Sequence, residues 1–80
     1  MAIVRLFAGA REAAGTGRDE IPGATVGEVL ASARIRYGEH FEAVLASSRV
    51  WLNGSPASDA DVVIASDEVA VLPPVSGGCR

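Results

Sequence analysis

The sequence predicts an α+β domain in which one main amphipathic helix covers one face of a small mixed β-sheet. Three observations support this prediction. Apolar residues alternate with other residues in short stretches near both ends of the chain, which is typical of strands. One longer stretch between them repeats its apolar residues at helical spacing. The 80 residues are 49% hydrophobic and 21% charged, so the chain has the size and composition of a single globular domain.

The N-terminal part of the chain predicts two strands joined by a loop. Residues 3–8 alternate, with Val4 and Leu6 on one face of the strand. Residues 9–17 are mostly small or polar and contain glycine, so we expect a loop there. A short second strand is expected over residues 17–22, where the alternation is weaker.

The main helix is predicted to begin after Thr25, because Thr25 and Glu28 have the spacing of a capping box. Gly38 is expected to end this helix. The positions on its apolar face are Val26, Val29, Leu30, Ala33 and Tyr37. A second, short helical segment follows. Its apolar residues, which we expect to point inward, are Phe41, Val44 and Leu45.

The C-terminal part of the chain predicts strands over residues 49–53 and 67–72. Asn53-Gly54 signals a tight turn, because both residue types tolerate positive φ. Pro73-Pro74 must end the last strand, since a proline nitrogen has no hydrogen to donate. The first and last strands can pair in parallel, because a long crossover separates them. This order fits a β-grasp, or ubiquitin-like, arrangement, although the pattern alone does not distinguish it from a ferredoxin-like split βαβ fold.

Composition argues against several classes of protein. A net charge of −3 and a pI of about 4.9 disfavour binding to nucleic acid or to an anionic membrane. No apolar run approaches the ~18 residues of a transmembrane helix, and residues 1–10 lack the pattern of a secretory signal, so we expect a cytoplasmic protein. The single cysteine excludes an internal disulfide or a four-cysteine metal site. All seven basic residues are arginine, so the chain offers no lysine amine for covalent chemistry.

We expect no active site within the domain itself. His40, the only histidine, is interpreted as a surface or capping residue, because no nucleophile accompanies it. Asp59 and Asp61 lack a third metal ligand and are interpreted as part of a solvated turn. The glycines between residues 9 and 17 are not followed by the lysine of a phosphate-binding loop, so they are interpreted as turn glycines.

The C-terminal segment is the strongest candidate for function. We divide the chain into a domain over residues 1–72 and a tail over residues 73–80, which contains Pro73-Pro74 and Gly77-Gly78. The prolines stiffen the base of the tail, and the glycines allow its end to enter a channel too narrow for side chains. On these residues alone two interpretations stay open: a segment that inserts into a partner protein, or an ordinary frayed terminus.

Several motifs occur in a characteristic order along nearly the whole chain. They are Val4-Arg5-Leu6-Phe7-Ala8 with Ala10-Arg11-Glu12, Thr25-Val26-Gly27-Glu28-Val29-Leu30, Leu52-Asn53-Gly54, Asp67-Glu68-Val69-Ala70-Val71-Leu72-Pro73-Pro74-Val75, and Gly77-Gly78. In these motifs the chain resembles the small subunit of molybdopterin synthase. That family of ubiquitin-like sulfur carriers also includes the thiamine sulfur carrier. The resemblance implies a β-grasp fold.

The resemblance also implies a mechanism. An E1-like adenylating enzyme would activate the carboxylate of Gly78 with ATP, and a sulfur donor would displace AMP to leave a thiocarboxylate. The carrier would then dock on the large catalytic subunit of molybdopterin synthase, with Gly77 giving the tail its clearance. There the sulfur would move onto a pterin precursor of the molybdenum cofactor. The chain is thus expected to be a non-catalytic subunit that binds no cofactor or metal of its own.

Docking on these partners requires a surface near the tail. Phe7 and Leu72 are expected on neighbouring strands, facing away from the helix, where they can form an exposed apolar patch. The predicted partner-binding residues are Phe7, Leu72, Pro73, Pro74 and Val75. Trp51 can share this face, although the family usually has a smaller residue at that position.

The sequence departs from the family pattern after Gly78, where Cys79-Arg80 follows. Gly78 therefore lies in a peptide bond and has no carboxylate to adenylate. Three explanations are possible: removal of Cys79-Arg80 by a zinc protease of the deubiquitinase type, attack of the Cys79 thiol on the Gly78 carbonyl, or a relative that only binds partners. We favour removal. The alternative functions are sulfur transfer in another pathway, for cysteine, thiamine or a thio-metabolite, and a ubiquitin-like modifier or binding module.

Overall fold

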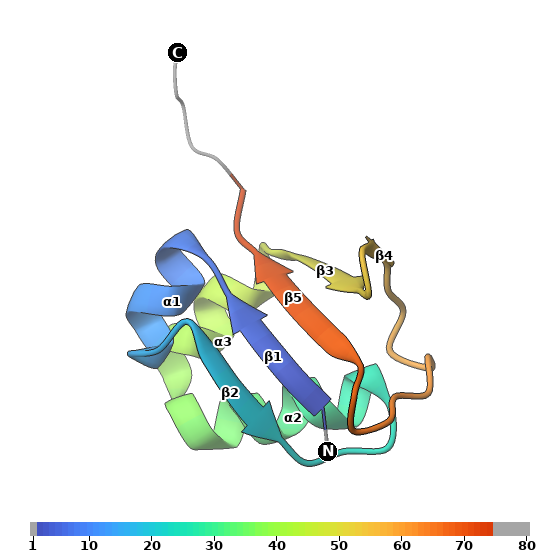
Figure 1. The fold of residues 1–80 in the computed structure, drawn as a ribbon. Coiled ribbons are helices and arrows are strands. Elements are labelled where there is room, and N and C mark those ends of the chain that lie inside the picture. The colour runs from blue at the N-terminus through green and yellow to red at the C-terminus, as the bar shows by residue number, and fades with distance from the viewer. Residues whose placement is uncertain (1, 75–80) are drawn as a thin grey trace.

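The structure is a computed structural model, and it describes residues 2–74. Within this range the chain forms five strands and three helices (Figure 1). The strands are β1 (Ala2–Leu6), β2 (Arg18–Ile21), β3 (Arg49–Leu52), β4 (Ser55–Pro56) and β5 (Glu68–Leu72). The helices are α1 (Ala8–Ala14), α2 (Val26–Tyr37) and α3 (Glu39–Ala46).

The strands form one mixed sheet in the order β2-β1-β5-β3-β4. The first and last strands, β1 and β5, pair in parallel at its centre, as predicted, and every other neighbouring pair is antiparallel. The three helices lie on one side of this sheet (Figure 1). Strand β2 pairs directly with β1, whereas a split βαβ fold places another strand between its first two. The chain therefore has the β-grasp fold and not the ferredoxin-like alternative.

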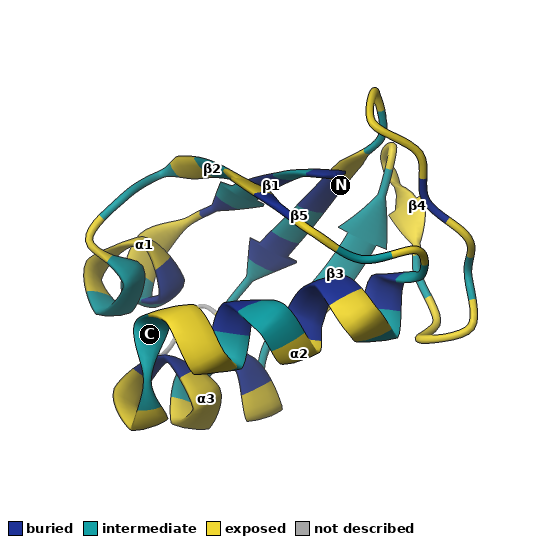
Figure 2. Ribbon diagram, turned by 90° about the horizontal axis from the view of Figure 1, so that it is seen from below, coloured by how far each residue is buried: buried dark blue, intermediate teal, exposed yellow. Residues whose placement is uncertain are grey.

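The hydrophobic core lies between the sheet and the helices (Figure 2). Val4 and Leu6 of β1 point into it, together with Val69 and Val71 of β5, and all four are buried. Phe41 of α3 is the largest fully buried side chain. Burial of each such side chain contributes about 1.5–3 kcal/mol, so the two central strands and α3 carry much of the stability. The inward orientation of Val4 and Leu6 agrees with the alternation in the sequence.

The predicted loop over residues 9–17 is wrong, because most of it is helix α1. The first strand also ends two residues earlier than predicted, at Leu6. Alanine is the best helix former, and Ala10 is fully buried, so packing and propensity together outweigh the glycine at the start of the segment. Gly15 ends the helix with φ of 79°, and its N–H donates to the carbonyl of Arg11. The weak second strand is confirmed as β2.

Helix α2 agrees with its prediction. The Thr25 hydroxyl accepts a hydrogen bond from the Glu28 N–H at 3.2 Å, and the Glu28 carboxylate accepts one from the N–H of Ala24 at 2.9 Å. The predicted apolar face points to the sheet, with Tyr37 half-buried at its end. The helix stops at Gly38, also as predicted. The short helical segment that follows is α3, in which Phe41 and Leu45 are buried.

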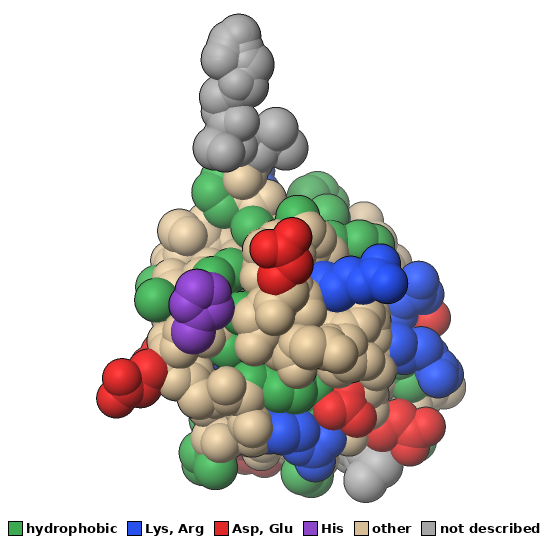
Figure 3. Space-filling view, turned by 90° about the vertical axis from the view of Figure 1, so that its left-hand side faces the viewer, with side chains coloured by type: hydrophobic (Ala, Val, Ile, Leu, Met, Phe, Trp, Pro, Cys, Tyr) green, Lys and Arg blue, Asp and Glu red, His purple; other side chains and the backbone are tan. Residues whose placement is uncertain are grey.

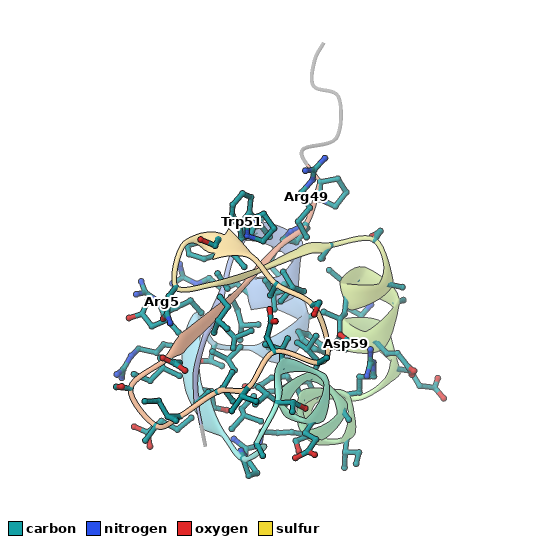
Figure 4. The ribbon with its side chains drawn as sticks, turned by 90° about the vertical axis from the view of Figure 1, so that its right-hand side faces the viewer. Arg5, Arg49, Trp51 and Asp59 are labelled. Carbon is teal, nitrogen blue, oxygen red and sulfur yellow. The ribbon has the colours of Figure 1, made fainter. Side chains whose placement is uncertain are left out.

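The first turn of α2 is held by a loop that includes Asp59, which lies beside the helix in Figure 4. The N–H of Gly27 donates to the carbonyl of Asp59 at 3.0 Å, and the N–H of Val26 donates to the carbonyl of Asp61 at 2.8 Å. A Cβ at position 27 would come within 3.0 Å of the Asp59 side chain and 3.1 Å of its carbonyl. Glycine at position 27 therefore allows this close approach, and a side chain there would make the Asp59 loop shift by a few tenths of an ångström.

A polar cluster ties the end of α2 to β2. The Tyr37 hydroxyl donates to the Asp19 carboxylate at 2.5 Å, and the Arg36 guanidinium donates to the same oxygen at 2.9 Å. These two hydrogen bonds lower the pKa of Asp19, because they stabilise its charged form. Burial, with the neighbouring carboxylate, raises the pKa of Tyr37. Tyr37 also makes an edge-to-face contact with the Phe41 ring, at 5.1 Å between centroids, so the cluster adjoins the core.

The Asp19 cluster predicts a defined pH dependence of stability. The pKa of Asp19 is lowered in the folded protein, so its contribution is complete above the unfolded pKa, near about pH 4, and is lost as pH falls through the folded pKa. We expect Asp19→Asn to lower the free energy of unfolding by about 1 kcal/mol at neutral pH. This difference should shrink as pH falls below the unfolded pKa, as measured by urea unfolding of both proteins at neutral and at acidic pH. An equal difference at both pH values would contradict this role.

In the part of the chain that the structure describes, none of the helices has the length and hydropathy needed to cross a bilayer.

Candidate functional site

The candidate site is built around the end of β5, where the chain leaves the sheet. β5 lies between β1 and β3, so hydrogen bonds hold it on both edges. Leu72 is its last residue; Pro73 is half-buried and Pro74 is exposed. The predicted residues Val75 and Gly77 to Arg80 lie outside the described residues. The structure therefore fixes the base of the predicted tail, at the end of one of the best-held strands in the fold.

The start of β5 is fixed as firmly as its sides. The Asn53 amide donates to the Asp67 carboxylate at 3.0 Å, and its oxygen accepts the Glu68 N–H at 2.9 Å. The other oxygen of Asp67 accepts the Ile64 N–H at 2.9 Å, and the hydrogen bond from Asn53 is the main cause of the lowered pKa of Asp67. Two motifs far apart in the sequence, Leu-Asn-Gly and Asp-Glu, thus set the register of the strand that leads to the tail.

The turn that carries Asn53 matches its prediction. Asn53 and Gly54 both have positive φ, at 51° and 85°, which suits a two-residue hairpin turn. The hairpin continues into β4 (Ser55–Pro56), a two-residue strand that the sequence analysis did not predict. The backbone N–H of Asn53 also donates to the carbonyl of Glu68 at 2.9 Å. Asn53 therefore serves both the turn and β5.

Two substitutions at Asn53 separate these two roles. Asn53→Gly keeps a backbone that accepts positive φ but removes the side-chain hydrogen bonds, so we expect a loss of about 1 kcal/mol in the free energy of unfolding. Asn53→Ala also strains the turn and should cost about 1 kcal/mol more. Urea unfolding at neutral pH measures both. A glycine variant as stable as the parent would show that the amide does not hold β5.

Phe7 and Leu72 lie where the prediction places them. Phe7 directly follows β1, keeps an extended backbone, and is 42% exposed, while the preceding Leu6 is buried. Leu6 pairs with Val71 in the parallel ladder, so the next step places Phe7 next to Leu72, which is half-buried. The Phe7 N–H donates to the Val71 carbonyl at 3.3 Å. Their role in binding a partner stays a prediction.

The sheet has a second face, away from the helices, which we call the open face. Side chains alternate along a strand, so residues that neighbour the buried ones point to the open face. The pairing places Arg5, Ala70, Trp51 and Pro56 in one row across four strands. Trp51 is half-buried and shares this face, as the alternation suggested. Figure 4 shows Arg5 and Trp51 on the side away from the helices, and Arg49 beside the end of β5.

On the helix side of the tail base lies an apolar hollow of about 620 Å³. It is lined by residues of α1 and α3, by the residue that caps α3 and by the two prolines, and most of them are small or apolar: Ala8, Gly9, His40, Ala43, Val44, Ser47, Pro73 and Pro74. Figure 3 shows the molecule from the side of α1, with hydrophobic side chains gathered below the described end of the chain. Pro73 and Pro74, which form the base of the tail, thus lie between this hollow and the open face. Nothing in the sequence pattern indicated the hollow, because it depends on α1, which was predicted to be a loop.

The structure also places the weaker candidates. His40 is exposed in the first turn of α3, at the edge of the hollow, as expected of a surface residue. The Asp61 carboxylate accepts the Ser58 N–H at 2.9 Å, so it closes the turn that holds α2. Within residues 2–74, no three histidine, cysteine or acidic residues are grouped so that they could hold a metal. The N–H of Leu6 in β1 donates to the carbonyl of Gly17 at 3.0 Å, so Gly17 belongs to the connection that leads into β2.

The fold and the site together define a class of protein. It is a ubiquitin-like β-grasp domain whose last, central strand leads directly into a segment with Pro-Pro and Gly-Gly. The chain belongs to the ThiS family of β-grasp sulfur carriers, and the sequence model of that family matches residues 4–78. The match spans the domain and the Gly-Gly pair.

Solved structures support this assignment. The chain is similar to small archaeal modifier protein 1 from Haloferax volcanii, with 32% identity and a TM-score of 0.81 over 96% of this chain and 98% of that one. The same protein from Methanosarcina acetivorans has 32% identity and a TM-score of 0.85, over 96% and 95%. A putative molybdopterin converting factor, subunit 1, from Pyrococcus furiosus has 28% identity and a TM-score of 0.79, over 92% and 97%. The comparison with curated proteins finds no match.

Proposed function

We propose that this chain is the sulfur-carrying small subunit of a molybdopterin synthase. The observation that carries the proposal is the position of β5, which is held on both edges and leads into a Pro-Pro and Gly-Gly sequence beside the exposed Phe7 side chain. Membership of the ThiS family supports the carrier role, and the likeness to a molybdopterin converting factor subunit supports the pathway.

The proposed chemistry takes place on the main chain of Gly78, inside partner proteins. The carboxylate of Gly78 attacks the α-phosphate of ATP, which releases pyrophosphate and leaves an acyl adenylate. A sulfur nucleophile of the hydrosulfide class then attacks the carbonyl, and the bond to AMP breaks, leaving the thiocarboxylate. ATP and the pterin acceptor belong to the partners, and this chain contributes the carbonyl carbon. Gly77 gives clearance, because a side chain next to the reacting group would block a narrow channel.

Processing is part of this proposal. Gly78 is joined to Cys79 by a peptide bond, so it has no carboxylate until that bond is hydrolysed. A zinc protease of the deubiquitinase type would add water across the bond and release the residues beyond Gly78. The chain with Cys79-Arg80 is then an inactive precursor. Phe7, Leu72, Pro73, Pro74 and Val75 would contact the partners both before and after processing.

Adenylation tests both the function and the precursor. We expect a version that ends at Gly78 to support ATP–pyrophosphate exchange with the E1-like adenylating enzyme of the same organism, and the 80-residue chain to support none. The physical reason is that Gly78 has no free carboxylate in the longer chain, because it is joined to Cys79. With a sulfur donor present, intact-mass spectrometry should show one oxygen replaced by sulfur in the shorter version only.

Two results would contradict this view. Exchange at the same rate with the longer chain would remove the need for processing. No exchange with either version, while both fold normally by circular dichroism, would remove the carrier function. A version that ends at Gly77 is the matched control for length, because it keeps a free carboxylate at the wrong position.

A second candidate function is protein modification, because the chain is 32% identical to small archaeal modifier protein 1 over 96% of its length. In that case the activated Gly78 would form amide bonds with amines of other proteins. This chain has no lysine, so it cannot extend conjugates through its own side-chain amines.

The modifier function therefore predicts single additions and no lysine-linked chains. A tagged version that ends at Gly78, expressed in the organism it comes from, should form covalent adducts with other proteins. Each modified lysine of a target should carry one copy of the carrier. A version without Gly77-Gly78 should give none. Peptide mass spectrometry that finds no carrier remnant on lysine would leave sulfur transfer as the function.

Sulfur transfer in a cysteine, thiamine or thio-metabolite pathway would give a different result from the molybdopterin pathway. The chain would still form a thiocarboxylate, but the large subunit of molybdopterin synthase would not consume it.

A further inference from the structure

We propose that Asn53 is a site of spontaneous deamidation that the fold suppresses, and that its conversion to aspartate or isoaspartate loosens the start of β5. The chain contains one asparagine and no glutamine, and the residue after that asparagine is Gly54. Deamidation begins with attack by the backbone nitrogen of the next residue, which glycine leaves unhindered because it has no side chain. The only side-chain amide of this sequence therefore stands where this attack is easiest. The inference goes beyond the proposed function and does not depend on it.

The reaction needs only water as a co-reactant. The backbone nitrogen of Gly54 attacks the side-chain carbonyl carbon of Asn53 and loses its proton, and the side-chain nitrogen leaves as ammonia. The cyclic imide that remains is opened when water adds to one of its carbonyls and breaks the bond from that carbonyl to nitrogen. Opening at the side-chain carbonyl gives aspartate, and opening at the main-chain carbonyl gives isoaspartate. Asn53 and Gly54 are both exposed, so water reaches them.

The fold holds the Asn53 side chain away from this attack. Its amide nitrogen donates to the Asp67 carboxylate at 3.0 Å, and its oxygen accepts the Glu68 N–H at 2.9 Å. The backbone is held as well, because the Asn53 N–H donates to the Glu68 carbonyl at 2.9 Å. These contacts direct the side chain towards β5, whereas the attack requires its carbonyl carbon to approach the nitrogen of Gly54. The imide can therefore form only after the hydrogen bonds to β5 break in a local opening of the turn.

The products cannot restore these contacts. In the aspartate product a carboxylate oxygen replaces the donating nitrogen, and it faces an oxygen of Asp67 where the hydrogen bond was. Asp67 is itself charged, because hydrogen bonds from Asn53 and from the Ile64 N–H lower its pKa, so the two carboxylates repel each other. Isoaspartate adds a backbone atom to the turn, so Leu52 and Ser55 can no longer pair in the same register. Either product makes a transient opening of the turn permanent.

The position of Asn53 determines which part of β5 is loosened. The ladder between β3 and β5 ends at the pair Leu52 and Val69, and Asn53 continues it by bonding Glu68 through both its backbone and its side chain. Loss of the side-chain hydrogen bonds therefore frays β5 at its start, on the side of β3. On the other side Ile3 still pairs with Glu68, so the change is local and the deamidated chain stays folded.

Deamidation rates of the folded and unfolded chain test the suppression. The full 80-residue chain is incubated at mildly alkaline pH with and without denaturing guanidinium chloride, and peptide mass spectrometry follows the exchange of –NH2 for –OH at Asn53. We expect the folded chain to react about tenfold more slowly, because the hydrogen bonds of the amide must break first. Asp67→Ala removes one of these bonds and should speed the folded reaction about threefold without changing the unfolded one.

The matched control is Asp61→Ala, which removes a carboxylate that closes a different turn and should change neither rate. Equal acceleration by Asp61→Ala would assign the effect to general destabilisation and contradict the role of Asp67. Equal rates in the folded and unfolded parent chain would overturn the suppression, and this comparison needs no variant. An unfolded chain that shows no exchange at Asn53 would remove the site altogether.

Exchange of the two side chains tests the consequence for β5. Asn53→Asp reproduces the aspartate product and should lower Tm by about 4–8 °C. Asn53→Asp combined with Asp67→Asn again places an amide opposite a carboxylate and leaves the acceptors for the Ile64 and Glu68 N–H groups, so most of the lost Tm should return. In this double variant the asparagine precedes Glu68 and not glycine, so its unfolded chain should deamidate far more slowly than the parent. A double variant that recovers no Tm would show that the product does not act through Asp67.

Discussion

The parallel pairing of β1 and β5 is the constraint on which the rest of this structure depends. It joins the two ends of the domain at the centre of the sheet and buries Val4, Leu6, Val69 and Val71 against the helices. Because the pair is parallel, a long crossover must connect its strands, and that connection contains α2, which covers one face of the sheet. The opposite face stays open. The same pairing brings Phe7 next to Leu72, so core, open face and tail base follow from one ladder.

Polar contacts outside the ladder fix its position. Asn53 and Asp67 hold the start of β5, and Asp19 holds β2 to the end of α2. These contacts lie away from the end of β5 and serve to keep it rigid. A carrier needs this rigidity, because the partner must find the base of the tail in one place before it draws the tail into a channel. In the proposed function, the domain thus contributes position, and the reacting carbonyl belongs to Gly78, beyond it.

Much of this could be predicted from the sequence, but not all of it. The alternation at Val4 and Leu6 correctly predicted a strand, and the helical spacing from Val26 to Tyr37 correctly predicted α2. In both elements the buried side chains recur with the period of that secondary structure. Helix α1 was missed, because the glycines of residues 9–17 favoured a loop in the local pattern, whereas the alanines and the burial of Ala10 favour the helix. The hollow at the tail base was missed with it. The row of Arg18, Arg5 and Trp51 depends on register between distant strands, which alternation does not specify.

The use of arginine alone has a chemical consequence at this site. An acyl adenylate reacts with any nearby unprotonated amine, and a lysine beside the tail base would supply one in a small fraction of molecules at neutral pH. A guanidinium keeps its proton throughout the physiological pH range, so it supplies charge without a nucleophile. Arg49 pairs with Leu72, the last residue of β5 before the tail. In the proposed function, a positive surface made of arginine therefore supplies charge at this position without a nucleophile that could attack the activated carboxyl group.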